Sequence, residues 1–156
     1  MRVRDLGILQ NTAAYDGTTM QYKGFWKYNT YDFVTNYLHM KTNLNQVNMW
    51  MIEAVGYSYA YGTKIRSAWT FHLWNNSIYN TGLSRLGGDG GCNPTNVYRS
   101  SDGYVVIVAY SGNWGYCGFM LNGYNTGDGY GQSSISSDQT PQIIASAFSG
   151  GNSPIY

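Results

Sequence analysis

Apolar and polar side chains alternate with a period of two over most of this chain, which is the pattern of β-strands with one buried face. Gly, Asn, Thr and Tyr interrupt every window long enough for the 3.6-residue period of a helix, so we expect no helix. Between Val105 and Val108 every side chain is aliphatic, which predicts a strand in the middle of a packed sheet. The expected strands are Met20–Tyr28, Asn48–Tyr61, Lys64–Trp74, Tyr104–Tyr110, Tyr116–Tyr124 and Gln142–Phe148.

Short strands at roughly ten-residue spacing, with turn signals between them, indicate an all-β fold. We expect an antiparallel β-sandwich, jelly-roll-like if its connections cross between the sheets, and a barrel is the alternative. The chain of 156 residues is about the length of one domain. We therefore expect residues 1–15 to be an N-terminal lead-in or docking segment and residues 16–156 to form a single β-sandwich domain.

Four Asp-Gly pairs mark tight turns, because Asp tolerates and Gly favours the positive φ that such turns need. They begin at Asp16, Asp89, Asp102 and Asp128. We expect a hairpin at least at Asp102-Gly103. The D-x-D-x-D-G spacing of a calcium loop does not occur, and the chain contains a single Glu. The sequence therefore predicts no metal site and no cofactor.

Two long segments rich in Gly and Asn separate the expected strands, Asn75–Ser101 and Asn122–Pro141. Loops of this length without structure of their own are commonly functional, so both are candidate binding regions.

The composition of the chain is typical of a protein that presents a recognition surface. The chain has 16 Tyr and 20 Gly, only 11% of its residues are charged, and its net charge is +1. Tyr offers stiff contact area at low entropic cost, and Ser, Gly and Asn offer adaptable hydrogen bonds, which suits neutral sugars. A net charge near zero favours association, so we expect a homo-oligomer.

Aromatic residues in a β-sandwich belong more often to the core than to a ligand site. Trp50 and Trp69 lie within expected strands, and we assign both to the core. Other aromatic residues lie at strand ends or beside Asn, Ser and Gly, where a ring can be presented to a glycan. The candidate glycan-binding residues are Trp74, Tyr79, Trp114, Tyr116 and Tyr130.

The sequence holds little catalytic chemistry. A glycosidase needs two carboxylates, and Glu53 and Asp32 are the least turn-like acids on offer. His39 and His72 have no G-x-S-x-G elbow or Cys-His signature near them, and we interpret His72 as a structural histidine. We expect a protein that is not an enzyme and has no catalytic residue.

Two further alternatives follow from residue types. Residues 23–28 interleave Lys with aromatic rings, but the basic patch expected of a nucleic-acid-binding protein is absent from the sequence.

Cys92 and Cys117 can pair or stay free as small buried hydrophobes, and the sequence leaves both open. No stretch has the apolar length of a signal peptide or membrane span, so we expect no membrane insertion.

Several segments resemble virion surface proteins of tailed bacteriophages from aquatic environments, and tail-fibre tips in particular. The likeness is in strand composition and order over YLHMKTNLN (37–45), MWMIEAVGYSYAYG (49–62), IRSAWTFHLW (65–74), SSDGYVVIVAY (100–110) and YCGFMLNGY (116–124).

The resemblance implies a role and no catalytic site. It implies a homotrimer at the virion surface, assembled in the host cytoplasm, with other virion proteins and a host surface glycan as partners. A capsid decoration protein without receptor binding is the first alternative. A polysaccharide-degrading enzyme that uses Glu53 or Asp32 as its acid is the second.

Overall fold

The computed structural model describes residues 20–29, 37–59, 62–87, 92–110, 116–125, 140–149 and 156. Within this part of the chain all regular structure is β-strand, as predicted, and no helix occurs. The strands are β1 (Met20–Asn29), β2 (Tyr37–Thr42), β3 (Asn48–Ser58), β4 (Thr63–Trp74), β5 (Ser77–Gly87), β6 (Asn93–Arg99), β7 (Val105–Tyr110), β8 (Cys117–Asn125) and β9 (Ile143–Ser149).

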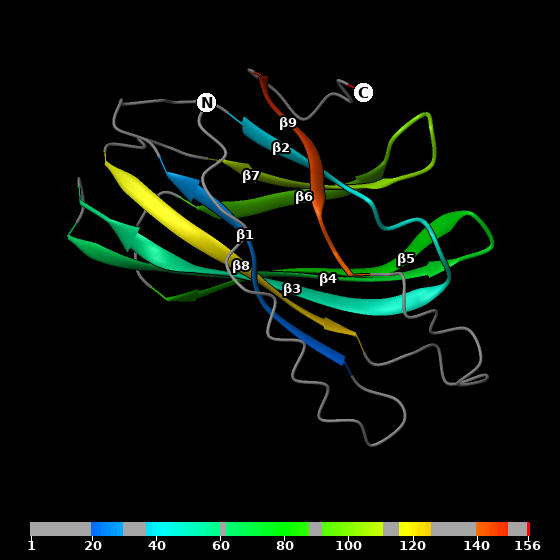
Figure 1. Cartoon of the computed structure of the whole chain (residues 1–156), viewed down its shortest axis with the longest axis horizontal. Helices are drawn as coiled ribbons and strands as arrows, with labels where there is room; N and C mark the ends of the chain where they lie inside the picture. The colour runs from blue at the N-terminus through cyan, green and yellow to red at the C-terminus, as the bar shows by residue number, and fades with distance from the viewer. Residues whose placement is uncertain are drawn as a thin grey trace.

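Two antiparallel sheets pack face to face as a β-sandwich (Figure 1). The five-stranded sheet has the order β1-β8-β3-β4-β5, and the four-stranded sheet has the order β6-β7-β2-β9. The expected sandwich is therefore confirmed, and the barrel alternative is wrong. Jelly-roll connectivity is not confirmed, because β3, β4 and β5 form a meander within one sheet.

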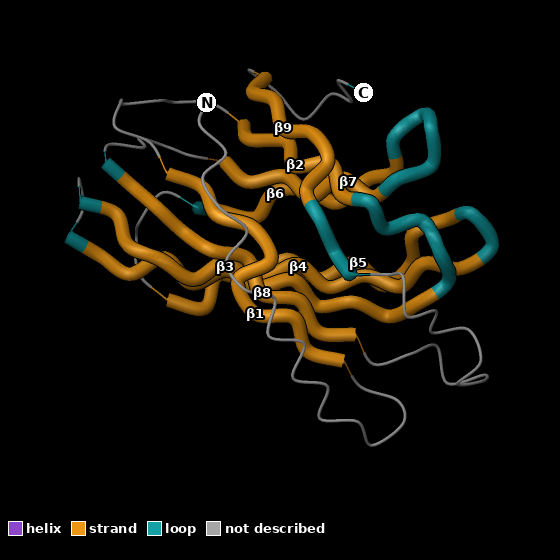
Figure 2. The backbone as a smooth tube through the Cα atoms, in the orientation of Figure 1, coloured by secondary structure: helices purple, strands orange, loops and turns teal. Residues whose placement is uncertain are grey.

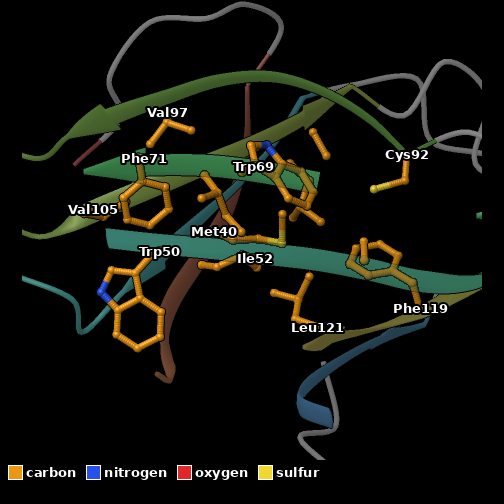
Figure 3. Close-up of a cluster of buried hydrophobic side chains, with 14 of the residues drawn as sticks. Met40, Trp50, Ile52, Trp69, Phe71, Cys92, Val97, Val105, Phe119 and Leu121 are labelled. Carbon is orange, nitrogen blue, oxygen red and sulfur yellow. The ribbon is translucent and has the colours of Figure 1, made fainter. Parts of the chain in front are cut away.

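The core lies between the sheets and is built from the inward residues of both (Figure 3). Trp50 and Trp69 are both buried in it, as expected. Trp69 also joins the two layers, since its Nε1 donates a hydrogen bond of 3.0 Å to the carbonyl oxygen of Val108 on β7. Every residue from Val105 to Ala109 is buried, and β7 lies between β6 and β2, which confirms the predicted interior strand.

The interior strand β2 is missing from the expected strands. Of the expected loop Asn122–Pro141, residues 122–125 belong to β8 and residues 126–139 lie outside the described residues. The other expected loop is wrong. The segment Asn75–Ser101 contains β5 and β6 instead of irregular structure. Both are edge strands, so only one side of each backbone is paired and the alternating apolar pattern is weak. Pro94 on β6 adjoins a break in register, where a residue without an N–H is tolerated. Figure 2 shows how little of the described chain lies outside strands.

Local backbone conformations fit the turn chemistry read from the sequence. Asp102-Gly103 does connect β6 and β7 as a hairpin, with Gly103 at φ +92° and its N–H bonded to the Ser100 carbonyl at 2.9 Å. In β1, Phe25 departs from the alternation because a bulge at Gly24, φ +60°, shifts the register between Tyr22 and Trp26. The expected segment 1–15 and the other Asp-Gly pairs lie outside the described residues.

Candidate functional site

Three exposed tyrosines gather where β3 ends and β8 begins, at the left of Figure 1. Tyr57 is 52% exposed, Tyr59 66% and Tyr116 50%. The rings of Tyr59 and Tyr116 meet edge to face, with centroids 5.8 Å apart. Exposed aromatic groups of this kind mark binding surfaces more often than isolated exposed residues do. We call these three residues the tyrosine platform.

Strand pairing explains why the rings stand together. The N–H of Tyr59 donates to the Tyr116 carbonyl at 3.3 Å, which continues the β3–β8 ladder beyond Ser58. Tyr57 and Tyr59 are two residues apart, so strand alternation places them on one face. Across the ladder Tyr57 is paired with Gly118, which has no side chain to cover the ring.

Tyr116 has an unusual backbone for an aromatic residue, with φ +47°. The left-handed region disfavours residues with a Cβ, and outliers of this kind cluster at functional sites. The conformation turns the chain into β8 and places the Tyr116 ring against Tyr59.

The platform lies on the outer face of the five-stranded sheet, the face turned away from β6, β7, β2 and β9. Glu53 lies on the same outer face of β3 and is only 5% exposed. Its Oε1 accepts a hydrogen bond of 2.8 Å from Arg66 Nε, and its Oε2 lies 3.4 Å from the Tyr124 hydroxyl, which donates. The hydrogen bond between Arg66 and Glu53 and the negative charge of Glu53 raise the pKa of the Arg66 guanidinium.

This environment argues for a structural role of Glu53. Retaining and inverting glycosidases both place a second carboxylate near the first. The neighbours that the structure gives Glu53 are a guanidinium and a phenol instead. Asp32, the other acid considered, lies outside the described residues.

The structure does not bring the predicted glycan-binding residues together. Trp74 ends β4 and Tyr79 lies on β5, so both are at the β4–β5 hairpin, at the right of Figure 1. Tyr116 is at the opposite end of the sheet. The two ends are separated by the length of β3, whose 11 residues span about 33 Å. Trp114 and Tyr130 lie outside the described residues.

The hairpin end is a second aromatic surface on the same face. Tyr79 is 46% exposed and is paired with His72, whose ring centroid lies 6.1 Å from that of Trp74. Asn75 and Asn76 form the two-residue turn with φ 45° and 61°, a conformation that Asn tolerates. His72 is thus part of a surface hairpin, and the structural role expected for it stays a prediction.

The His39 side chain connects strands of the four-stranded sheet through hydrogen bonds. It is fully buried, and its Nδ1 lies 3.1 Å from the Tyr98 hydroxyl and its Nε2 2.8 Å from Ser149 Oγ. The hydroxyl of Tyr156 donates to the His39 carbonyl at 3.2 Å. The contacts link β2 to β6, to β9 and to Tyr156, and they explain why a histidine is enclosed here.

Cys92 and Cys117 are both buried and free. Burial raises the pKa of both thiols, that of Cys117 to about 12, so neither is a nucleophile at neutral pH. No group of three or more potential metal ligands occurs among the residues that the structure places.

Sequence reasoning missed Tyr57 and Tyr59 as surface residues. The expected strand between residues 48 and 61 has apolar side chains on both faces, a pattern that predicts burial of both faces. The signal that could have found the platform is the change from Met and Val to Tyr toward the end of that strand, because Tyr tolerates water where Met and Val do not.

Comparisons of the chain with protein-family models, with curated proteins and with solved structures gave no match. Within the described ranges no helix has the length and apolar character needed to cross a membrane.

Proposed function

We propose that this chain is a virion surface protein of a tailed bacteriophage, a trimeric tail-fibre tip that binds host cell-surface polysaccharide. The observation that carries the proposal is the tyrosine platform. Its three tyrosines are about half exposed or more, and they lie where β3 and β8 pair with each other. The face of an aromatic ring is electronegative and attracts the polarised C–H groups of a sugar, while the phenol hydroxyl bonds to sugar hydroxyls.

Oligomerisation is part of the proposal because a single sugar site binds weakly. A dissociation constant of about 1 mM corresponds to about −4.1 kcal/mol, which does not hold a particle on a cell. Linking sites raises avidity by about 10²–10⁴ without new contacts. Large apolar side chains on the edge strands β5 and β9 support subunit contacts: Leu83, Leu86, Ile144 and Phe148 are all more than 40% exposed.

The direct experiment measures binding of the purified oligomer to an array of bacterial surface polysaccharides. We expect binding that falls when Tyr57→Ala and Tyr59→Ala are combined, while the far-UV circular dichroism stays unchanged. Absence of binding to the array and to whole bacteria would refute the proposal. Light scattering that finds a stable monomer at micromolar concentration would refute the trimer.

A capsid decoration protein is the second candidate, and the exposed apolar residues of β5 and β9 favour it equally, because they suit contacts with a shell. Labelling the protein on virions separates the two roles. Label at fibre ends supports the tail-fibre tip, and label over the capsid supports decoration.

A further inference from the structure

Among the residues that the structure describes, the exposed charges near the tyrosine platform are positive, although the whole chain is nearly neutral. The described part of the five-stranded sheet carries one acid, Glu53, which is buried against Arg66. The same strands carry five cationic residues, all exposed: Lys23, Lys27, Lys64, Arg66 and Arg85.

Strand register places three of these cations beside the platform. Lys64 is the cross-strand partner of Tyr57, so its side chain stands next to the ring on the outer face. One pair further along the sheet, Arg66 is paired with Val55. Val55 is paired on its other side with Met120, which is itself paired with Lys27. The outer face at this end thus holds Lys64, Arg66 and Lys27 around apolar side chains.

The dimensions suit an extended chain and not a single ion. Neighbouring strands are about 4.8 Å apart, so the backbones of Lys27 and Arg66 are about 14 Å apart across β1, β8, β3 and β4. Glu53 bonds Arg66 through Nε, and the side chain of Arg66 is still 61% exposed. Its remaining N–H groups can therefore meet an anion.

We propose that the ligand of this surface is an acidic polysaccharide, whose carboxylate or sulfate groups bind Lys27, Lys64 and Arg66 while its sugar rings lie on the tyrosine platform. This rests on the proposed polysaccharide-binding function and narrows its ligand class from polysaccharides in general to anionic ones. Three spaced cations suit a polymer with one charge per sugar or fewer. The denser phosphates of a nucleic acid call for a larger basic patch.

The test titrates the oligomer with four probes by biolayer interferometry: a polyuronate, a sulfated galactan, neutral dextran and a single-stranded oligonucleotide. We expect the polyuronate or the sulfated galactan to bind at least about 10-fold more tightly than dextran, and the stronger of the two identifies the anion. Raising NaCl from 50 to 500 mM should weaken that binding about 10-fold, because exposed charges are screened.

Matched variants assign the effect to this surface. Lys64→Gln combined with Lys27→Gln should weaken acidic-polysaccharide binding about 10-fold, and dextran binding much less. Arg85→Gln is the control, since Arg85 is on the same sheet but is paired with the inward residue Ser67. We expect it to change binding less than 2-fold.

If dextran and the acidic polymers bind equally, and the variant that combines Lys64→Gln with Lys27→Gln keeps its affinity, the proposal of an acidic ligand is overturned. The proposal that the tyrosine platform binds polysaccharide then stays intact. Tighter binding of the oligonucleotide than of either acidic polysaccharide also overturns it. Absence of binding to every polysaccharide overturns both proposals.

Discussion

Replacing Trp69 with Phe tests how the two sheets are held together. Trp69 is fully buried on β4, and its indole N–H donates to the Val108 carbonyl on β7, which belongs to the other sheet. Phe keeps an aromatic ring in the core but removes the donor and part of the volume. The variant therefore separates the contribution of this contact between the sheets to stability from the contribution of a buried aromatic ring as such.

The cost has three parts of similar size. A lost hydrogen bond costs about 1 kcal/mol net. A residual void of about 40 Å³ costs about 1 kcal/mol at about 24 cal/mol per Å³. The buried ring atoms that are lost contribute about 1 kcal/mol of transfer free energy. We expect Trp69→Phe to lower the free energy of unfolding by about 3 kcal/mol.

Urea unfolding followed by far-UV circular dichroism measures this value, with the m-value checked for constancy. Trp74→Phe is the control, because Trp74 is only partly buried at the end of β4, and we expect a loss below about 1 kcal/mol. A loss below about 1 kcal/mol for Trp69→Phe as well would show that the contact between the sheets is not as described.

Three other predictions follow from the described residues. Gly56→Ala on β3 places a methyl group against the backbone of Gly118 and Phe119, so we expect a loss at or above the upper end of the usual 1–3 kcal/mol for overpacking, measured by urea unfolding; a fully stable variant would contradict the β3–β8 register. Hydrogen bonds from Lys41 and Ser100 hold the pKa of Asp102 below its ordinary value, so the unfolded chain takes up a proton first as the pH falls, and stability drops between about pH 5 and pH 2. Asp102→Asn should make the urea midpoint less sensitive to pH over that range, and an unchanged slope would refute the contact. Both thiols should resist alkylation at pH 8 until the chain unfolds, and stability should fall as the pH rises from about 9 toward 12, because the unfolded thiols ionise first; rapid native-state labelling of Cys117 would contradict its burial.

Much of the fold was predictable where side chains alternate against a core, but the interior strand β2 was missed, although its Leu38 and Met40 are buried. The strands β3, β4, β7 and β8 each have an inward face of apolar residues, and their expected ranges agree with the structure to within three residues. β5 and β6 were not predictable in this way, because their sequences keep Gly, Asn and Pro, which are uncommon in strands.

The candidate site was less predictable, because its parts come together through pairing between distant strands. Tyr116 was identified as a strand-end aromatic residue, but its contact with Tyr59 depends on the β3–β8 register, which no local pattern reveals. The grouping of Lys27, Lys64 and Arg66 likewise requires the order β1-β8-β3-β4. The composition suggested neutral sugars as ligands, and the net charge of the chain does not reveal this grouping of cations.

The central claim is that the tyrosine platform binds polysaccharide. Isothermal titration of platform variants with the polysaccharide that binds the unchanged protein tests this claim most directly. Combining Tyr57→Ala, Tyr59→Ala and Tyr116→Asn removes three exposed rings, and Asn tolerates the positive φ at position 116. Tyr79→Ala removes one similarly exposed ring at the hairpin end of the same face. We predict a loss of affinity of at least about 30-fold for the platform variant and less than about 2-fold for Tyr79→Ala. Unchanged affinity in the platform variant, or a larger loss in Tyr79→Ala, would contradict the claim.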